Sequence, residues 1–432
     1  MKKKNKAIYL LFLMPFVYFA TACFVVWLVK TSGIYPSGSD TMYHVYRGDY
    51  VYNAIKSGNW YPLYDPAWYN GVEILRYWSP FPAYVMAFCQ YLAGGSQFGA
   101  YLFYIGGVCF LGACVWPFIG RGFNRPYLGA FIGLLWFFIP NNLCAIFIEG
   151  NLARSLSMIF LPVFIYSVYK YLYNHKLRYI PLMVFTFLLM ELCHLGYAGM
   201  VAIAVIIYGI VYIIQKGRKK AVLDVVISMI FGFMLLGIWL VASLRGGITS
   251  LDNSENMANF FQNLWITINP FERLTRGFEY FYFGFATLVV IVFGILFGYK
   301  KSRTGFVTGF IILLMTTKSA YAVLKHLPGS QYLWMLRFIS IALCMILMSF
   351  LMWDRLKKTL VLMLCVLLVV DTIPSLSLIV GEHNDISVQE RMVARQDSTL
   401  ISSAQAVTKQ RLALMDESIL GATGSWPVSY TH

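Results

Sequence analysis

The chain has 432 residues, of which 59% are hydrophobic and only 12% are charged, about half the charged share of an ordinary water-soluble domain. This balance excludes a soluble globular domain and predicts an integral membrane protein. The formal net charge of +15 comes from short Lys and Arg clusters between apolar segments, so no basic domain is available for a nucleic acid.

Apolar segments along the chain predict an all-α polytopic membrane protein with about eleven transmembrane helices. The first, at 8–29, lacks a following signal-peptide cleavage site, so we expect it to be retained. The others are expected at 97–119, 127–147, 155–173, 179–194, 197–214, 222–243, 281–299, 304–322, 332–352 and 359–379. The shorter segment 81–93 is interpreted as an amphipathic helix on the outer membrane surface.

Basic loops between these segments predict the topology. By the positive-inside rule, clusters such as 2–6 and 216–220 lie in the cytoplasm, which places the N-terminus inside and the C-terminus outside. We expect a transmembrane domain at 1–380, with a large first outer loop at 30–96. The polar tail at 381–432 contains possible short strands and is interpreted as the start of a truncated extracytoplasmic domain.

The sequence lacks the motifs of several common metal sites and enzyme classes. All eight cysteines lie in apolar stretches without CxxC or Cys/His spacing, so we expect neither disulfides nor a structural zinc. Walker, GxSxG and HExxH motifs do not occur in the sequence.

The first outer loop carries charged residues directly after an apolar span. Asp40, His44 and Arg47 are spaced i, i+4, i+7, so a helix starting at Ser39 would carry them on one face with Asp40 in its first turn. A carboxylate there suits a general base or a ligand of a divalent cation such as Mg²⁺ or Mn²⁺. A capping Asp beside a solvated ion pair is an equally good interpretation.

The remainder of this loop is rich in aromatic residues. Trp60, Trp68 and Trp78 offer flat faces that suit sugar rings, although anchoring at the membrane interface is the commoner role of any single ring. Glu73 and Arg76 are secondary candidates.

Further charged residues lie beside later apolar segments. Arg154 suits a lipid phosphate, and the alternative is a snorkelling side chain or a pair with Glu149. His194 marks a turn between two spans, where a structural histidine is somewhat more expected than a catalytic one.

Lys318 and Arg337 place positive charge on the expected outer face, where the positive-inside rule disfavours it, and this indicates an anionic ligand. For Arg337 the alternative is an internal pair with an acidic residue of the outer loops, namely Asp40, Asp49 or Glu149.

The stretches "SDTMYHVYRGDYVYNAIKSGNWYP", "YNGVEILRYWSPFPAY", "EGNLARS" and "LRFISIA" together resemble bacterial multi-pass membrane proteins labelled as 6-pyruvoyl-tetrahydropterin synthase-related. Those proteins in turn resemble glycosyltransferases of the GT-C fold. The resemblance implies a bacterial cell membrane, Asp40 as catalytic base or metal ligand, and Asp49 or Glu149 as a second acid. It also implies a polyprenyl-phosphate sugar donor whose phosphate is held by Arg154, Lys318 and Arg337. The paired-acid motif of several GT-C families is absent, because Thr41 and Met42 follow Asp40.

These observations lead to one hypothesis with two alternatives. We expect a glycosyltransferase that moves a sugar from a polyprenyl-phosphate donor to a glycan, lipid or protein acceptor, with His44 and Arg47 orienting Asp40. The alternatives are a transporter or flippase of lipid-linked glycans, for which Asp371 and Lys318 would be the membrane charges, and a non-catalytic assembly protein.

Overall fold

The computed structural model describes residues 2–33, 35, 36, 38, 40–65, 71–76, 78–245, 265, 268, 269, 282–330, 333–353, 356–376 and 379. This part of the chain is helical, and its only extended pairing is an isolated antiparallel bridge between Asp65 and Val72. The tail at 381–432, with its expected strands, and most of the loop 244–280 lie outside the described residues.

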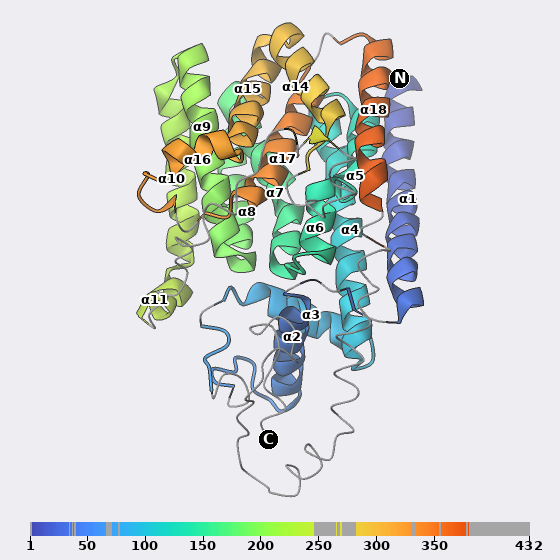
Figure 1. Ribbon diagram of the computed structural model, residues 1–432, viewed down its shortest axis with the longest axis vertical. Helices are drawn as coiled ribbons and strands as arrows, with labels where there is room; N and C mark the ends of the chain where they lie inside the picture. Colours follow the sequence, from blue (N-terminus) through green and yellow to red (C-terminus); the bar gives the residue numbers. More distant parts are fainter. Residues whose placement is uncertain are drawn as a thin grey trace, which may run out of the picture. The chain divides into compact units, whose positions relative to one another are not determined.

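Helices form at every segment where a span was expected (Figure 1). They are α1 (Lys2–Ser32), α4 (Gln97–Gly122), α5 (Pro126–Trp136), α6 (Pro140–Phe147), α7 (Leu152–Asn174), α8 (Tyr179–Cys193), α9 (Leu195–Lys216), α10 (Lys219–Leu235), α11 (Gly237–Arg245), α14 (Phe285–Phe297), α15 (Lys300–Met315), α16 (Lys318–Leu324), α17 (Phe338–Leu351) and α18 (Lys358–Thr372). The first outer loop adds α2 (Thr41–Lys56) and α3 (Phe81–Leu92).

Eleven complete spans are not confirmed. Within the described part, 5 helices are long and apolar enough to cross a membrane, or 6 if α10 and α11, bent by 66°, form one span. The expected span 304–322 divides at 316–317. The segment 127–147 has a break at 137–139, although Pro126–Phe147 as a whole is one of the five candidate spans. At about 1.5 Å per residue, helices of 13 to 16 residues such as α14 and α15 fall short of a bilayer core about 30 Å thick.

The chain divides into two compact units. Unit 1 contains Met1–Thr21, Val108–Cys144 and Arg154–Leu376, and unit 2 contains Ala22–Gly107, Ala145–Ala153 and Ser377–His432. Several long helices contribute to both units.

The centre of unit 1 is α17, all of whose residues are buried. Helix α15 packs on it closely, because Gly305 and Gly309 lie against Ser349 and Ile346, where any side chain would collide. The small-residue spacing of "GFVTG" therefore marks a helix contact, as does "GAFIG" at 129–133, which packs against α4.

In unit 2, α2 packs against α3. Its core gathers Tyr43, Val51, Ile74, Leu75 and two alanines of α3. The expected helix at 81–93 is confirmed as α3, which buries Met86 and Cys89 and exposes Phe88 and Tyr91.

Candidate functional site

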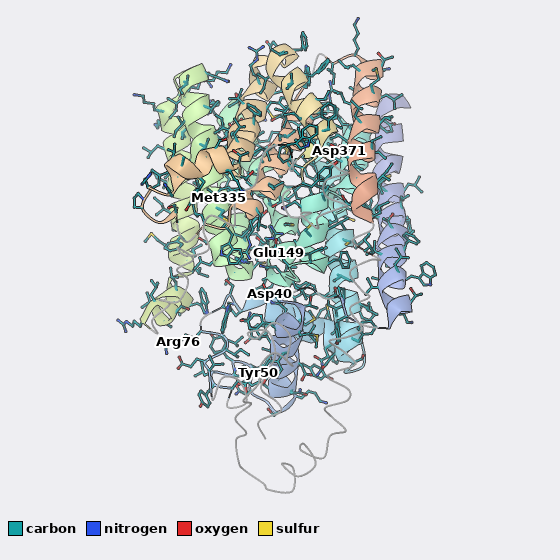
Figure 2. All side chains as sticks on the ribbon, viewed as in Figure 1. Asp40, Tyr50, Arg76, Glu149, Met335 and Asp371 are labelled. Atoms are coloured by element: carbon teal, nitrogen blue, oxygen red, sulfur yellow. The ribbon has the colours of Figure 1, made fainter. Side chains whose placement is uncertain are left out.

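Asp40 lies at the N-cap position of α2, directly before the first helical residue. The helix therefore starts at Thr41, two residues after the expected start, and the Asp40 side chain makes no capping hydrogen bond. Instead, the Asp40 backbone N–H donates to the Glu149 carbonyl oxygen at 2.9 Å, and the Asp40 carbonyl accepts from His44 N–H at 3.1 Å. Two acidic residues from distant parts of the sequence thus meet within unit 2 (Figure 2).

The turn that follows Glu149 fits tightly on the start of α2. Gly150 has a φ of 63°, in the left-handed region that favours glycine, and a Cβ atom there would collide with Thr41. Gly38 is equally constrained, because its Cβ would lie 2.7 Å from the Gly150 nitrogen. This close fit holds the Glu149 backbone beside that of Asp40, and no local pattern in the sequence indicates it.

His44 and Arg47 are both buried, at 8% and 2% exposure, so neither belongs to a solvated ion pair. Burial, with a smaller contribution from the Arg47 charge, lowers the pKa of His44 to about 3, so this imidazole is neutral at physiological pH.

Arg47 anchors the loop that precedes α3. Its Nη2 donates to the carbonyl oxygens of Ile74, Trp78 and Ser79 at 3.5, 3.3 and 3.4 Å. Its guanidinium carbon lies 5.3 Å from the Tyr43 ring centre and 5.7 Å from that of Trp78. These contacts give Arg47 a structural role in holding this loop.

Other candidates of the first loop also have structural partners. Asp49 accepts from Gln90 Nε2 at 2.6 Å, which joins α2 to α3. Glu73 and Arg76 form an ion pair with each other. Trp60 is 70% exposed, and Trp68 lies outside the described residues.

A second group of candidates lies in unit 1, where Arg337 Nη1 is 3.3 Å from His194 Nε2. His194 is the N-cap of α9, and its Nδ1 accepts the Tyr197 N–H at 3.1 Å. The proton of the neutral imidazole therefore belongs on Nε2, so this ring nitrogen and Arg337 are both donors. A guanidinium and an imidazole N–H therefore lie close together at this point of unit 1.

Helix ends strengthen this positive site. Arg337 ends a short 3₁₀ turn, η4 (Met335–Arg337), directly before α17, so the N-termini of α9 and α17 both lie here. The first turns of these helices are joined by a 2.8 Å hydrogen bond between the Tyr197 hydroxyl and Ser340 Oγ. The Arg337 guanidinium carbon also lies 4.7 Å from the Trp334 ring centre.

Two buried polar residues that the sequence analysis missed support this turn. Asn141 Nδ2 donates to the Leu336 carbonyl at 3.3 Å, and Ser340 Oγ donates to the Arg337 carbonyl at 3.0 Å. Asn141 follows the break in the segment 127–147, and an asparagine inside an apolar segment was the available signal.

The two remaining cations differ in burial. Arg154, at the start of α7, is 0% exposed, which excludes a snorkelling side chain. Lys318 is exposed at the first residue of α16.

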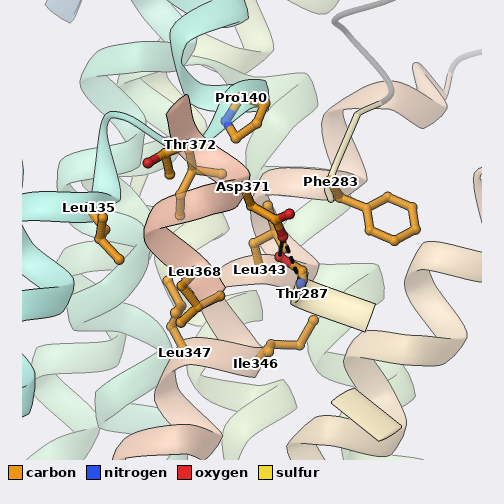
Figure 3. A pocket seen from close by; sticks show the side chains of 11 residues that line it. Leu135, Pro140, Phe283, Thr287, Leu343, Ile346, Leu347, Leu368, Asp371 and Thr372 are labelled. Carbon is orange, nitrogen blue, oxygen red and sulfur yellow. Dashed lines mark hydrogen bonds between the residues drawn. The ribbon is translucent and has the colours of Figure 1, made fainter. Parts of the chain in front are cut away.

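Asp371 was the candidate membrane charge of the transport alternative, and it caps another helix (Figure 3). One carboxylate oxygen accepts Ala286 N–H at 3.1 Å, and the other accepts Thr287 N–H at 2.7 Å and the Thr287 hydroxyl at 3.0 Å. A small cavity beside it is apolar except for Asp371, Thr287 and Thr372. Both oxygens are thus engaged at the N-terminus of α14, which explains this buried charge without a transported substrate.

Among the described residues, no group of three His, Cys, Asp or Glu side chains lies close enough together to hold a metal ion.

Comparison with known proteins gives the family. The profile described as 6-pyruvoyl-tetrahydropterin synthase related domain, membrane protein, matches residues 75–379, which is more than half of the chain. No curated protein matches the chain. The matched region begins after Asp40, so it does not include this residue. The match shows membership of this family and says nothing about a relation to GT-C glycosyltransferases. The chain belongs to the 6-pyruvoyl-tetrahydropterin synthase-related family of membrane proteins.

Proposed function

We propose that this membrane protein is a glycosyltransferase that moves a sugar from a polyprenyl-phosphate donor to an acceptor hydroxyl at the outer membrane face. The observation that carries the proposal is the junction of Asp40 with Glu149 in unit 2. Asp40 follows the end of α1, a candidate span, by eight residues, so the chain can place its carboxylate no more than about 30 Å from that helix end.

Asp40 is the proposed general base. Its carboxylate takes the proton of the acceptor hydroxyl while that oxygen attacks the anomeric carbon of the donor sugar. The bond between this carbon and the phosphate oxygen breaks, and polyprenyl phosphate leaves with the electron pair. A single displacement of this kind inverts the anomeric configuration.

Arg337 and His194 are the proposed phosphate-binding residues. A guanidinium and an imidazole N–H directed at one place suit the oxygens of a phosphate ester, and two helix N-termini add positive potential. Arg154 and Lys318 are secondary candidates for binding the same phosphate. Each assignment is tested by its own measurement, Asp40 by sugar transfer and Arg337 by binding of the donor.

A divalent cation is compatible with the proposal. Asp40 and Glu149 would supply its carboxylate ligands, and the ion would neutralise charge on the leaving phosphate. Glu149 would in that case act as a metal ligand or as a second acid beside Asp40.

The direct test uses the purified chain in nanodiscs with radiolabelled polyprenyl-phosphate sugars and candidate acceptors, with and without Mg²⁺ or Mn²⁺. The proposal predicts consumption of at least one donor and a product of inverted anomeric configuration. Failure to bind or consume any donor of the panel would contradict it, and retention of configuration would reject the single displacement.

A further inference from the structure

An exposed group of large side chains follows the C-terminus of α2. We call Trp60, Tyr61, Leu63 and Tyr64 the aromatic platform; their exposed fractions are 70%, 45%, 63% and 55%. These four large side chains lie within five residues of the sequence, and together they form an exposed, mostly apolar patch outside the candidate spans. A patch of this kind generally marks a surface that binds something.

The backbone beneath the platform is held at several points. The Tyr84 hydroxyl donates to the Trp60 carbonyl at 2.7 Å, and the Tyr50 hydroxyl donates to the Tyr64 carbonyl at 2.7 Å. At the start of the loop, Tyr61 N–H donates to Asn59 Oδ1 at 3.2 Å.

The residue after the platform is held as well. Asp65 and Val72 exchange two backbone hydrogen bonds of 2.8 and 2.9 Å, and the Tyr46 hydroxyl donates to Asp65 Oδ2 at 2.6 Å. Tyrosines of α2 and α3 thus fix the loop from below while the platform side chains stay exposed. A surface held in place in this way loses little conformational entropy when a ligand binds.

The chemistry of the platform favours an uncharged ligand with both apolar and hydroxyl-bearing faces. Residues 57–64 contain no charged side chain, so they offer nothing to a nucleic acid or an anionic headgroup. Aromatic faces bearing O–H and N–H groups match the apolar faces and hydroxyls of a sugar ring.

We propose that the aromatic platform binds a neutral saccharide, and that this saccharide is the acceptor glycan. The second part rests on the proposed glycosyltransferase function, whereas saccharide binding itself does not. Trp60 supplies the main stacking surface, Tyr61 and Tyr64 widen it, and Tyr84 positions Trp60 through the backbone.

The experiment measures binding of the full chain in nanodiscs to an array of short neutral oligosaccharides. We expect Trp60→Ala to weaken binding at least tenfold and Trp60→Phe to weaken it less, because the smaller ring still stacks. Tyr84→Phe removes a hydroxyl without touching the platform side chains, and it should weaken binding several-fold. Tyr91→Ala is the matched control, since Tyr91 is a 71% exposed aromatic of the same unit outside the platform.

The Asp40→Asn variant distinguishes a failure of the saccharide-binding proposal from a failure of the proposed glycosyltransferase function. It should abolish transfer and leave oligosaccharide binding unchanged, so loss of one property does not imply loss of the other. The proposal is overturned if wild type binds no oligosaccharide, or if Trp60→Ala binds as tightly as wild type.

Hydroxyl-radical footprinting in nanodiscs distinguishes the competing occupants. The saccharide proposal predicts that Trp60 is oxidised readily and becomes protected when a bound oligosaccharide is added. Protection of Trp60 without any sugar would place lipid or protein on the platform and reject the proposal.

Discussion

Replacement of Asp371 offers the sharpest test of the packing of unit 1. Its carboxylate accepts two backbone N–H groups and one hydroxyl at the start of α14, at 3.1, 2.7 and 3.0 Å. Gly284, with a φ of 98°, lies so close to this carboxylate that a Cβ atom would collide with it. The cap joins α18 to α14 across more than eighty residues of sequence.

The cost of Asp371→Ala follows from these contacts. Two buried N–H groups left without an acceptor cost about 1–3 kcal/mol each, and loss of a carboxylate at a helix N-terminus adds up to about 2 kcal/mol. Allowing for partial relaxation, we expect a total of about 3–5 kcal/mol. Asp371→Asn keeps one acceptor oxygen and should lose about half as much.

Two measurements check this prediction. Reversible unfolding in mixed micelles gives the change in free energy, and amide exchange at Ala286 and Thr287 should accelerate by about a hundredfold for a local loss of about 3 kcal/mol. Thr372→Val is the matched control, because Thr372 lies next to Asp371 and its hydroxyl donates only to the Val369 carbonyl of its own helix. Stability within about 0.5 kcal/mol of wild type, with unchanged exchange at both amides, would refute the reasoning.

Four further predictions follow from the two units. Because the pKa of His44 is about 3 in the fold and 6.5 when unfolded, the unfolded chain gains a proton as the pH falls between these values, and stability falls with it. Lowering the pH from 7 to 5 should therefore cost about 2 kcal/mol in denaturation experiments, and His44→Gln should flatten the dependence; equal slopes would contradict this. Gly150→Ala should cost about 1–3 kcal/mol and also reduce transfer, because it displaces Glu149; a fully active variant would show that the junction is unimportant. Arg47→Met should lower the stability of unit 2 by about 2–4 kcal/mol while the folded fraction keeps its transfer rate, and a rate loss exceeding the folding loss would restore a catalytic role. Arg337→Lys keeps the charge without the planar fork, so polyprenyl-phosphate binding measured by calorimetry should weaken about tenfold, and unchanged affinity would exclude Arg337 from the phosphate site.

Local patterns in the sequence predict the helices well and their interruptions poorly. The length of an apolar run locates each helical segment. The same apolar composition is compatible with one straight span and with two helices at an angle, such as α10 and α11, which are bent by 66°. The break at 137–139 precedes Pro140, which is a local signal, yet the buried Asn142 that donates to the Trp136 carbonyl there at 2.6 Å was not anticipated.

The candidate sites show the same limit. Spacing placed Asp40, His44 and Arg47 on one short helix, and the structure puts His44 and Arg47 in α2 with Asp40 at its N-cap. The spacing contained no sign that Arg47 holds a loop some thirty residues further on. The contact between His194 and Arg337 joins residues 143 positions apart, and no periodicity encodes such a pairing. The burial of a side chain and its hydrogen-bond partners depend on the tertiary structure. The sequence therefore identifies these residues as candidates but does not show their roles.

The most direct test of the central claim compares wild type with Asp40→Asn for donor binding and sugar transfer in the same nanodisc preparation. Glu73→Gln is the control, since Glu73 belongs to a partly exposed ion pair of the same unit. We predict that all three proteins bind the polyprenyl-phosphate sugar and that only wild type and Glu73→Gln transfer it. Transfer by Asp40→Asn at the wild-type rate would contradict the assignment of Asp40 as the base.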